Sequence, residues 1–258
     1  MAARGSGRAV WVWSARDLDG AWGFLERRRV TELFLHVPWE VRRRRDERAR
    51  IADAVARAHR AGIRVSALGG TPDWIHRPGE VVRRWLRPAL EAAPFDGVHL
   101  DVEPDFGQDR ARAARGLVDV AETVRAQLPA ATPLEVDVRF WYPSVRLGDT
   151  DLARALCGPA DCLSIMSYRR RTSGADGSIE LTRPTARAVA ETGSAFRVGQ
   201  ETLDLGPGPV QTKQTFFGRP AAELDAALGR LREALADAPG FAGLAVHDLP
   251  GWQALPRD

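Results

Sequence analysis

Short apolar runs alternate with longer amphipathic stretches along this chain. Eight runs rich in Val, Leu and Ile have the length of buried strands, at residues 9–13, 32–37, 63–68, 97–102, 134–140, 161–168, 196–202 and 243–247. Seven amphipathic stretches between them are typical of helices, at residues 18–29, 46–61, 79–92, 109–128, 150–157, 182–191 and 221–238. A short tail at 251–255 takes the place of a last helix.

This alternation predicts parallel strands joined by right-handed helical crossovers. Eight such units without a break predict an α/β fold, a single (β/α)8 TIM barrel with a short final helix, as one domain over residues 1–258. The length agrees with the roughly 250 residues of such barrels. An open doubly wound sheet is the alternative, but it would require a Gly-rich phosphate loop after the first strand, and WVWSARDLDG contains none.

Composition and charge exclude several partners. The net charge is only +3, and most Arg residues lie on helical stretches among Asp and Glu, so we expect no nucleic-acid surface. No apolar run approaches the roughly 20 residues that span a bilayer. The apolar run near the start is about five residues, below the 7–15 of a signal peptide, which favours a cytoplasmic protein that does not bind membranes.

The two cysteines, Cys157 and Cys162, form no metal-ligand or disulfide pattern. No C-x-x-C or H-x-E-x-H motif occurs, so we expect neither a metal nor a cofactor. Histidines on three separate strands could converge in a barrel, and this keeps a metal site as a lesser alternative.

The fourth strand, GVHLDVEP, carries the most informative polar pattern. Val98, Leu100 and Val102 share one face, which suits the surrounding helices, so His99, Asp101 and Glu103 point to the barrel axis. Barrel active sites lie at the carboxyl ends of the strands. Burying two neighbouring carboxylates is costly, and such groups typically serve function. The alternative is a salt-bridge network that only stabilises the core.

Other strands bring polar residues to the same end. Strand five, LEVDVRFW, places Glu135, Asp137 and Arg139 on one face, and Arg139 could neutralise Asp101 or bind a substrate oxygen. Further candidates at strand ends are His36, Tyr168, Glu201 and His247, although His36 and Tyr168 could equally be packing residues. His99 lies deeper and could anchor Asp101. The run from Arg169 to Arg171 could bind an anionic group or form a solvated loop.

Tryptophan is abundant, at eight of 258 residues. Trp39, Trp74 and Trp141 follow strands, where aromatic faces could stack on sugar rings or simply pack.

The segment FDGVHLDVEP resembles the strand-four signature D-G-x-D-x-D-x-E of family 18 glycoside hydrolases, the chitinase-like barrels. Asp96, Gly97, Asp101 and Glu103 match, and His99 stands where the first inner Asp lies. SIMSY is similar to the family's M-x-Y element. The resemblance implies that Glu103 is the acid/base, that Asp101 orients the substrate acetamido group and that Tyr168 supports it. His247 occupies the region of the family's strand-eight Trp.

The barrel is also similar to the retaining glycosidases of clan A, which place an acid/base Glu after strand four and a nucleophilic Glu after strand seven. Glu103 and Glu201 fall at those positions, and Val102 replaces the usual Asn.

We therefore expect an enzyme, a glycosidase or transglycosidase acting on a carbohydrate or glycoconjugate. Glu103 is the predicted general acid/base and Glu201 the nucleophile or second carboxylate, with Asp101 assisting if Glu201 points away. The predicted substrate-binding residues are His36, Trp39, Trp74, His99, Asp137, Arg139, Trp141 and His247. A lyase or isomerase using Glu103 and His247, and a degenerate barrel that only binds carbohydrate, are the alternatives.

Overall fold

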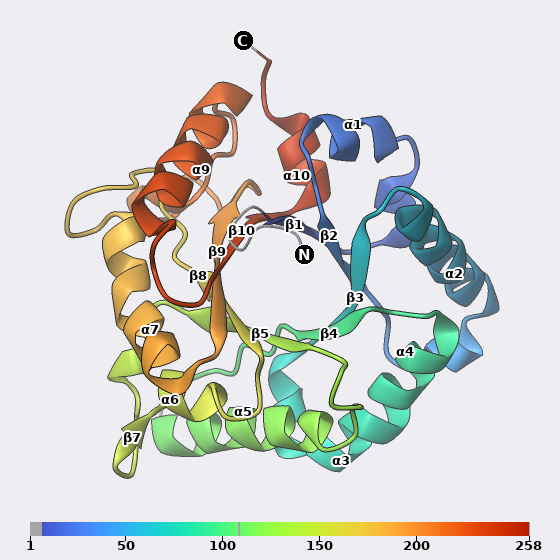
Figure 1. Ribbon diagram of the computed structural model, residues 1–258. Coiled ribbons are helices and arrows are strands. Elements are labelled where there is room, and N and C mark those ends of the chain that lie inside the picture. The colour runs from blue at the N-terminus through green and yellow to red at the C-terminus, as the bar shows by residue number, and fades with distance from the viewer. Residues whose placement is uncertain (1–6, 108, 258) are drawn as a thin grey trace.

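Eight parallel strands close into a barrel in the order β1-β10-β9-β8-β5-β4-β3-β2, so the predicted fold class is confirmed (Figure 1). The computed structural model describes residues 7–107 and 109–257. The barrel strands are β1 (Gly7–Val12), β2 (Glu32–His36), β3 (Arg64–Gly69), β4 (Gly97–Leu100), β5 (Leu134–Arg139), β8 (Cys162–Met166), β9 (Ala195–Glu201) and β10 (Phe241–His247). Each falls within two residues of a predicted strand at both ends.

A ring of helices surrounds the barrel (Figure 1). The α-helices that follow its strands are α1 (Trp22–Arg27), α2 (Arg45–Arg60), α3 (Pro78–Val81), α4 (Arg87–Ala92), α5 (Arg110–Arg125), α6 (Leu152–Leu156), α7 (Ser178–Thr192), α9 (Ala221–Leu235) and α10 (Leu249–Ala254). A π-helical turn, η4 (Val82–Leu86), joins α3 to α4. Short 3-10 helices are η1 (Ala15–Leu18), η2 (Val41–Arg43), η3 (Pro72–His76) and η5 (Tyr142–Ser144).

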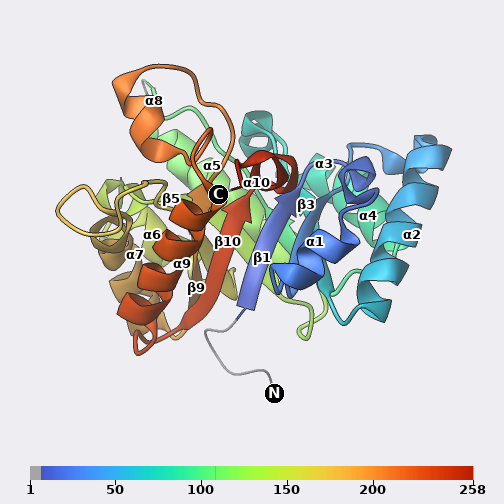
Figure 2. The ribbon, with the colours of Figure 1, turned by 90° about the horizontal axis from the view of Figure 1, so that it is seen from above.

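The sequence pattern did not predict two elements, a short helix and a small hairpin. The helix α8 (Pro209–Gln214) lies in the loop after β9 and stands above the carboxyl ends of the strands (Figure 2). It buries no residue, so it has no apolar period. A small hairpin of β6 (Arg146–Leu147) and β7 (Thr150–Asp151) precedes α6 and is too short to show alternation. The predicted helix at 150–157 therefore begins later, where Asp151 caps the backbone of α6.

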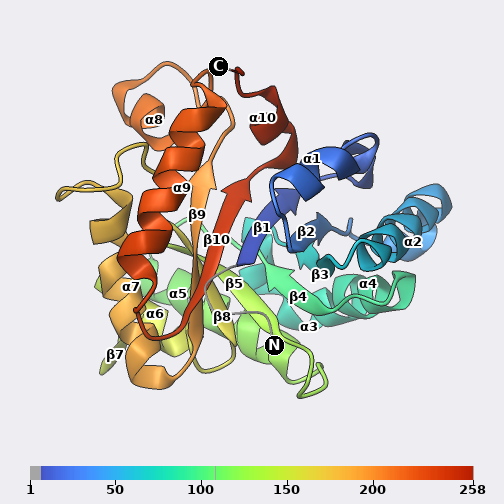
Figure 3. The ribbon, with the colours of Figure 1, turned by 45° about the horizontal axis from the view of Figure 1, so that its top comes forward.

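Apolar residues form two separate cores. The larger core lies between the strands and the helices, for example where α9 runs along the outside of β9 and β10 (Figure 3). The smaller core lies inside the barrel and consists of Ala9, Trp11, Phe34, Leu68 and Ala245. The described residues include no helix with the length and apolar character needed to cross a bilayer.

A buried ion network closes the amino-terminal end of the barrel. Arg197 on β9 donates to Glu135 on β5 (3.0 Å) and to Glu32 on β2 (2.9 Å), and all three side chains point inward. Ser164 also contacts Glu135, and Ser66 donates to Glu32 at 3.1 Å. An inward salt-bridge network of the kind considered for strand four thus exists. It lies nearer the amino-terminal end of the barrel than Asp101 and Glu103, and its residues come from β2, β5 and β9.

We expect Arg197→Met to lower the free energy of unfolding by about 3–5 kcal/mol, because it leaves two buried carboxylates without their cation. Urea unfolding followed by circular dichroism measures the change. Arg219→Met removes an arginine from the exposed i,i+4 pair with Glu223 and should leave the stability close to wild type. Equal small effects of both substitutions would show that the network contributes little.

Candidate active site at the carboxyl ends of the strands

His99 is the deepest polar residue of the candidate site. It is fully buried, stacks on Phe34 with ring centroids 3.8 Å apart, and meets the edge of Trp11. Its Nε2 lies 2.9 Å from Oδ2 of Asp137, but without the alignment of a hydrogen bond. Burial lowers the pKa of His99. The expectation that His99 anchors Asp101 was wrong, because its close contact is with Asp137 on the neighbouring strand.

Asp101 and Asp137 lie side by side across β4 and β5. His99 pairs with Glu135 and Leu100 with Val136, so the same register brings Asp101 beside Asp137. From the opposite wall of the barrel, Trp11 donates its indole N–H to Oδ2 of Asp137 at 3.1 Å. Each aspartate keeps a buried Oδ1 with no hydrogen-bond partner among the described residues.

The two aspartates repel each other's charge. Burial raises the pKa of Asp101 well above its usual range, and the carboxylates of Asp137 and Glu103 raise it further. Burial and the charge of Glu135 raise the pKa of Asp137 well above its usual range, although the Trp11 hydrogen bond opposes them. Both aspartates are therefore pushed toward the protonated state.

Glu103 lies at the mouth, above the aspartates. It accepts a hydrogen bond from Nε of Arg139 at 2.8 Å, and both side chains are 36% exposed. The guanidinium of Arg139 also lies 5.8 Å from the Trp141 ring. Arg139 therefore forms its ion pair with Glu103 and not with Asp101, and its role in substrate binding stays a prediction.

Glu201 and His247 form a hydrogen-bonded unit with Trp13. Both carboxylate oxygens of Glu201 lie 3.0 Å from Nδ1 of His247, and Oε1 also accepts the backbone N–H groups of Thr202 and Leu203. Trp13 donates its indole N–H to Nε2 of His247 at 2.9 Å. Burial lowers the pKa of His247, but the hydrogen bond and charge of Glu201 outweigh burial and raise it. Because an indole can only donate, the Trp13 contact requires the neutral Nδ1–H tautomer.

Tyr168 enters the same space from the end of β8. Its ring lies 6.3 Å from that of His247, and Gly199 makes room for it, because a Cβ at Gly199 would lie 3.1 Å from the ring. Burial and the charge of Glu201 raise the pKa of Tyr168 well above its usual range. The phenol therefore keeps its proton and can donate it in a hydrogen bond.

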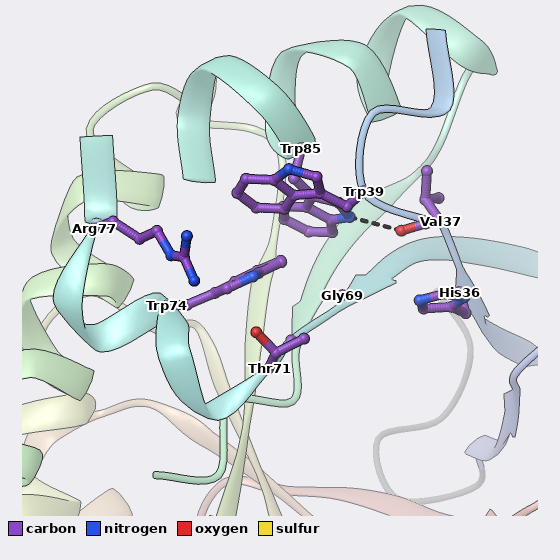
Figure 4. Close-up of a pocket in the computed structure, with 9 residues that line it drawn as sticks. His36, Val37, Trp39, Gly69, Thr71, Trp74, Arg77 and Trp85 are labelled. Atoms are coloured by element: carbon purple, nitrogen blue, oxygen red, sulfur yellow. Dashed lines mark hydrogen bonds between the residues drawn. The ribbon is translucent and has the colours of Figure 1, made fainter. Parts of the chain in front are cut away.

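The candidate tryptophans separate into two places. Trp39 and Trp74 meet at a cavity beside the mouth, which His36 also lines (Figure 4). Trp141 lies at the end of β5 and packs against Phe106 and Tyr142, with ring centroids 5.0 and 5.1 Å away.

Sequence reasoning missed several residues that build the site. Trp11 and Trp13 hold Asp137 and His247, and the alternation in WVW could have placed both indoles inside the barrel. Trp85, Thr71 and Arg77 line the cavity with Trp39 and Trp74, but no local pattern indicates that they meet.

The first arginine of the run after β8, Arg169, has a different role from those expected, whereas Arg171 is exposed. Arg169 is buried and donates to Asp176 at 2.9 Å, while its guanidinium lies 5.2 Å from the Phe140 ring. Lys213 of α8 also donates to Asp176 at 2.8 Å. At least the first arginine of the run therefore ties loops together, instead of lying in solvent or facing substrate.

Across 7–107 and 109–257, no three His, Cys, Asp or Glu side chains gather in a group that could hold a metal ion. The fold and the polar groups define this chain as a (β/α)8 barrel with a candidate site of clustered carboxylates at the carboxyl ends of its strands. No family model matches the chain, and no curated protein sequence matches it.

Solved structures with a similar fold include several enzymes that act on glycans. A chitinase from Bacteroides thetaiotaomicron has a TM-score of 0.63 at 12% identity, over 95% of this chain and 90% of its own. A GH113 β-1,4-mannanase has a TM-score of 0.64 at 9% identity, over 96% and 89%. The spore cortex-lytic enzyme SleL of Bacillus cereus has a TM-score of 0.61 at 12% identity, over 99% and 72%. At these identities the likeness shows the fold alone.

The raised pKa of Asp137 gives a testable pH dependence of stability. Between the unfolded and folded pKa values the folded chain binds more protons, so Asp137 makes stability fall as pH rises through this window. Asp137→Asn keeps an acceptor for Trp11 and removes this effect. We therefore expect the variant to gain stability relative to wild type between pH 4.5 and pH 8 in urea unfolding. Asp237→Asn, a change at an exposed position, should show no such gain. If the stability of Asp137→Asn changed with pH in parallel with that of the wild type, the effect would not come from the buried charge of Asp137.

Proposed function

We propose that this chain is a glycoside hydrolase that breaks the bond of a 2-acetamido sugar, with Glu103 as the general acid/base. The observation that carries the proposal is the group of adjacent carboxyl groups at the barrel mouth, where Glu103 is half exposed above the more deeply placed Asp101 and Asp137. Adjacent carboxyl groups can divide the tasks of proton transfer and of charge stabilisation at a glycosidic bond.

In the proposed reaction, protonated Glu103 donates its proton to the glycosidic oxygen as the bond to the anomeric carbon breaks. The acetamido oxygen of the same sugar attacks that carbon, and Asp101 accepts a hydrogen bond from the acetamido N–H. Glu103 then takes a proton from water, whose oxygen attacks the anomeric carbon and releases the acetamido group. Glu103 ends protonated, as it began.

Asp137 has a positioning role in this scheme. The resemblance to family 18 lacks one inner carboxyl group, because His99 replaces it, and Asp137 supplies a carboxyl group from the next strand. A proton on Asp101 can move to Asp137 when positive charge develops beside Asp101. The Trp11 N–H holds Asp137 in place, and His99 packs beside it.

Glu201 is better suited to orient His247 than to attack the sugar. It is 3% exposed, and its oxygens already accept hydrogen bonds from His247 and two backbone amides. This favours the acetamido-assisted reaction over a glycosyl-Glu201 intermediate. The same contacts occupy both nitrogens of His247, which disfavours the lyase or isomerase alternative.

Glu103→Gln should lower kcat/KM toward 4-nitrophenyl 2-acetamido glycosides by about 10²–10⁴-fold, because the amide cannot transfer the proton. Glycosides of the same sugars without the acetamido group should be poor substrates for the wild type. Glu91→Gln, which changes an exposed carboxylate paired with Arg42, is the matched control and should keep full activity.

Full activity in Glu103→Gln would overturn the acid/base assignment. Binding of glycans without turnover by the wild type would favour the alternative in which the barrel only binds carbohydrate.

Glu201→Gln should lower kcat/KM by about 5- to 10-fold, since changing a charged hydrogen bond to a neutral one costs about 1 kcal/mol. Azide added to Glu201→Ala should not restore turnover. A loss as large as that of Glu103→Gln, with azide forming a glycosyl azide, would instead identify Glu201 as the nucleophile.

A further inference from the structure

A cavity of about 220 Å³ lies beside the carboxylates, at the carboxyl ends of β2 and β3. Three indoles dominate its wall: Trp39 follows β2, Trp74 belongs to η3 and Trp85 to η4 (Figure 4). The volume is below the roughly 300–1,000 Å³ of pockets that take drug-sized ligands, so it suits one ring of a glycan.

The indoles are fixed in place before any ligand arrives. Trp85 is fully buried and donates its N–H to the carbonyl of Val37 at 2.9 Å. Gly69 makes room for it, because a Cβ there would lie 2.3 Å from the indole. Trp74 lies 4.8 Å from Trp85 and 5.7 Å from Trp39, measured between ring centroids. A rigid apolar wall of this kind costs little entropy when it stacks on a ligand.

The polar part of the cavity is positive. Its lining includes Thr71, His36 and Arg77 and contains no carboxylate. Arg77 points toward the indoles in Figure 4. It pairs with Asp73 at 3.2 Å, but the two side chains are 47% and 71% exposed, so water screens this pair and a ligand can replace it. A guanidinium presents paired N–H donors that match a carboxylate.

The backbone connects the cavity to the carboxylates. Gly70 lines the cavity and packs so closely on the carbonyl of Asp101 that a Cβ would lie 1.8 Å from its oxygen. A sugar ring bound at the tryptophans would therefore be the neighbour, in the same glycan, of the sugar bound over Asp101 and Glu103.

We propose that the Trp39–Trp74–Trp85 cavity is a subsite for one pyranose ring that carries a carboxylate, with Arg77 as the residue that recognises the acid. The proposal rests on the proposed function and names its substrate class: glycans in which a 2-acetamido sugar adjoins an acidic sugar. Trp39, the partly exposed indole of the three, binds the apolar face of the ring, while the buried Trp74 and Trp85 hold it in place. Arg77 binds the carboxylate at the open side.

Titration calorimetry with Glu103→Gln, which limits turnover, tests the proposal. The probe is a tetrasaccharide alternating N-acetylglucosamine and glucuronate, compared with the same tetrasaccharide after reduction of its carboxyl groups. We expect the acidic form to bind about tenfold more tightly, as a hydrogen bond to a charged group allows, and the preference to weaken at high salt.

Combining Arg77→Gln with Glu103→Gln should abolish the preference for the acidic tetrasaccharide. Combining Arg60→Gln with Glu103→Gln should leave the preference intact, because Arg60 is exposed at the other end of the barrel. Trp74→Ala should weaken binding of both forms, whereas Trp22→Ala, on the outer helix α1, should not. Trp74→Phe keeps an aromatic wall and serves if Trp74→Ala does not fold.

Equal affinity for the two tetrasaccharides, or a preference that survives Arg77→Gln, would overturn the subsite. If the wild type hydrolyses neutral 2-acetamido glycans without preferring the acid, the subsite fails and the proposed function stands. If it binds the acidic form selectively and hydrolyses nothing, the proposed function fails and the subsite stands.

Discussion

Barrel closure is the constraint on which the rest of this molecule depends. Once eight strands close, every second side chain enters an interior with no edge and little water. A charge placed there needs a partner or must lose its charge. In this barrel Arg197 bridges two carboxylates at the bottom. Asp101 and Asp137 at the top form no ion pair with an Arg or Lys among the described residues and are pushed toward the protonated state.

The polar groups of the interior therefore change along the barrel axis, from a paired ion network at the bottom to carboxyl groups with raised pKa at the top. The ion network at the amino-terminal end and the Trp11–Phe34–His99 layer above it are fully packed. Above them, hydrogen bonds from Trp11 and Trp13 orient Asp137 and His247 without neutralising any carboxylate. Asp137 is thus held by the uncharged indole of Trp11, whereas Glu103 at the mouth pairs with the guanidinium of Arg139.

Two glycines allow the carboxylates and the aromatic cavity to lie next to each other. Gly69 admits the indole of Trp85, and Gly70 admits the backbone of Asp101. Both lie where β3 ends, so one tight connection borders both the candidate site and the cavity beside it. The comparison with glycan-processing barrels shows a shared fold, while the roles of the residues depend on these local contacts.

The sequence alone determined the barrel and the inward face of β4, because strand alternation and the period of two are local properties of the chain. It also brought Asp101, Glu103 and Asp137 to one end. Only the tertiary structure decided which of these side chains lie in contact: Arg139 with Glu103, His99 with Asp137, and Glu201 with His247. It likewise decided that Trp74 meets Trp39 while Trp141 does not. Such pairings depend on strand register and on loops far apart in the chain, and no local pattern encodes them.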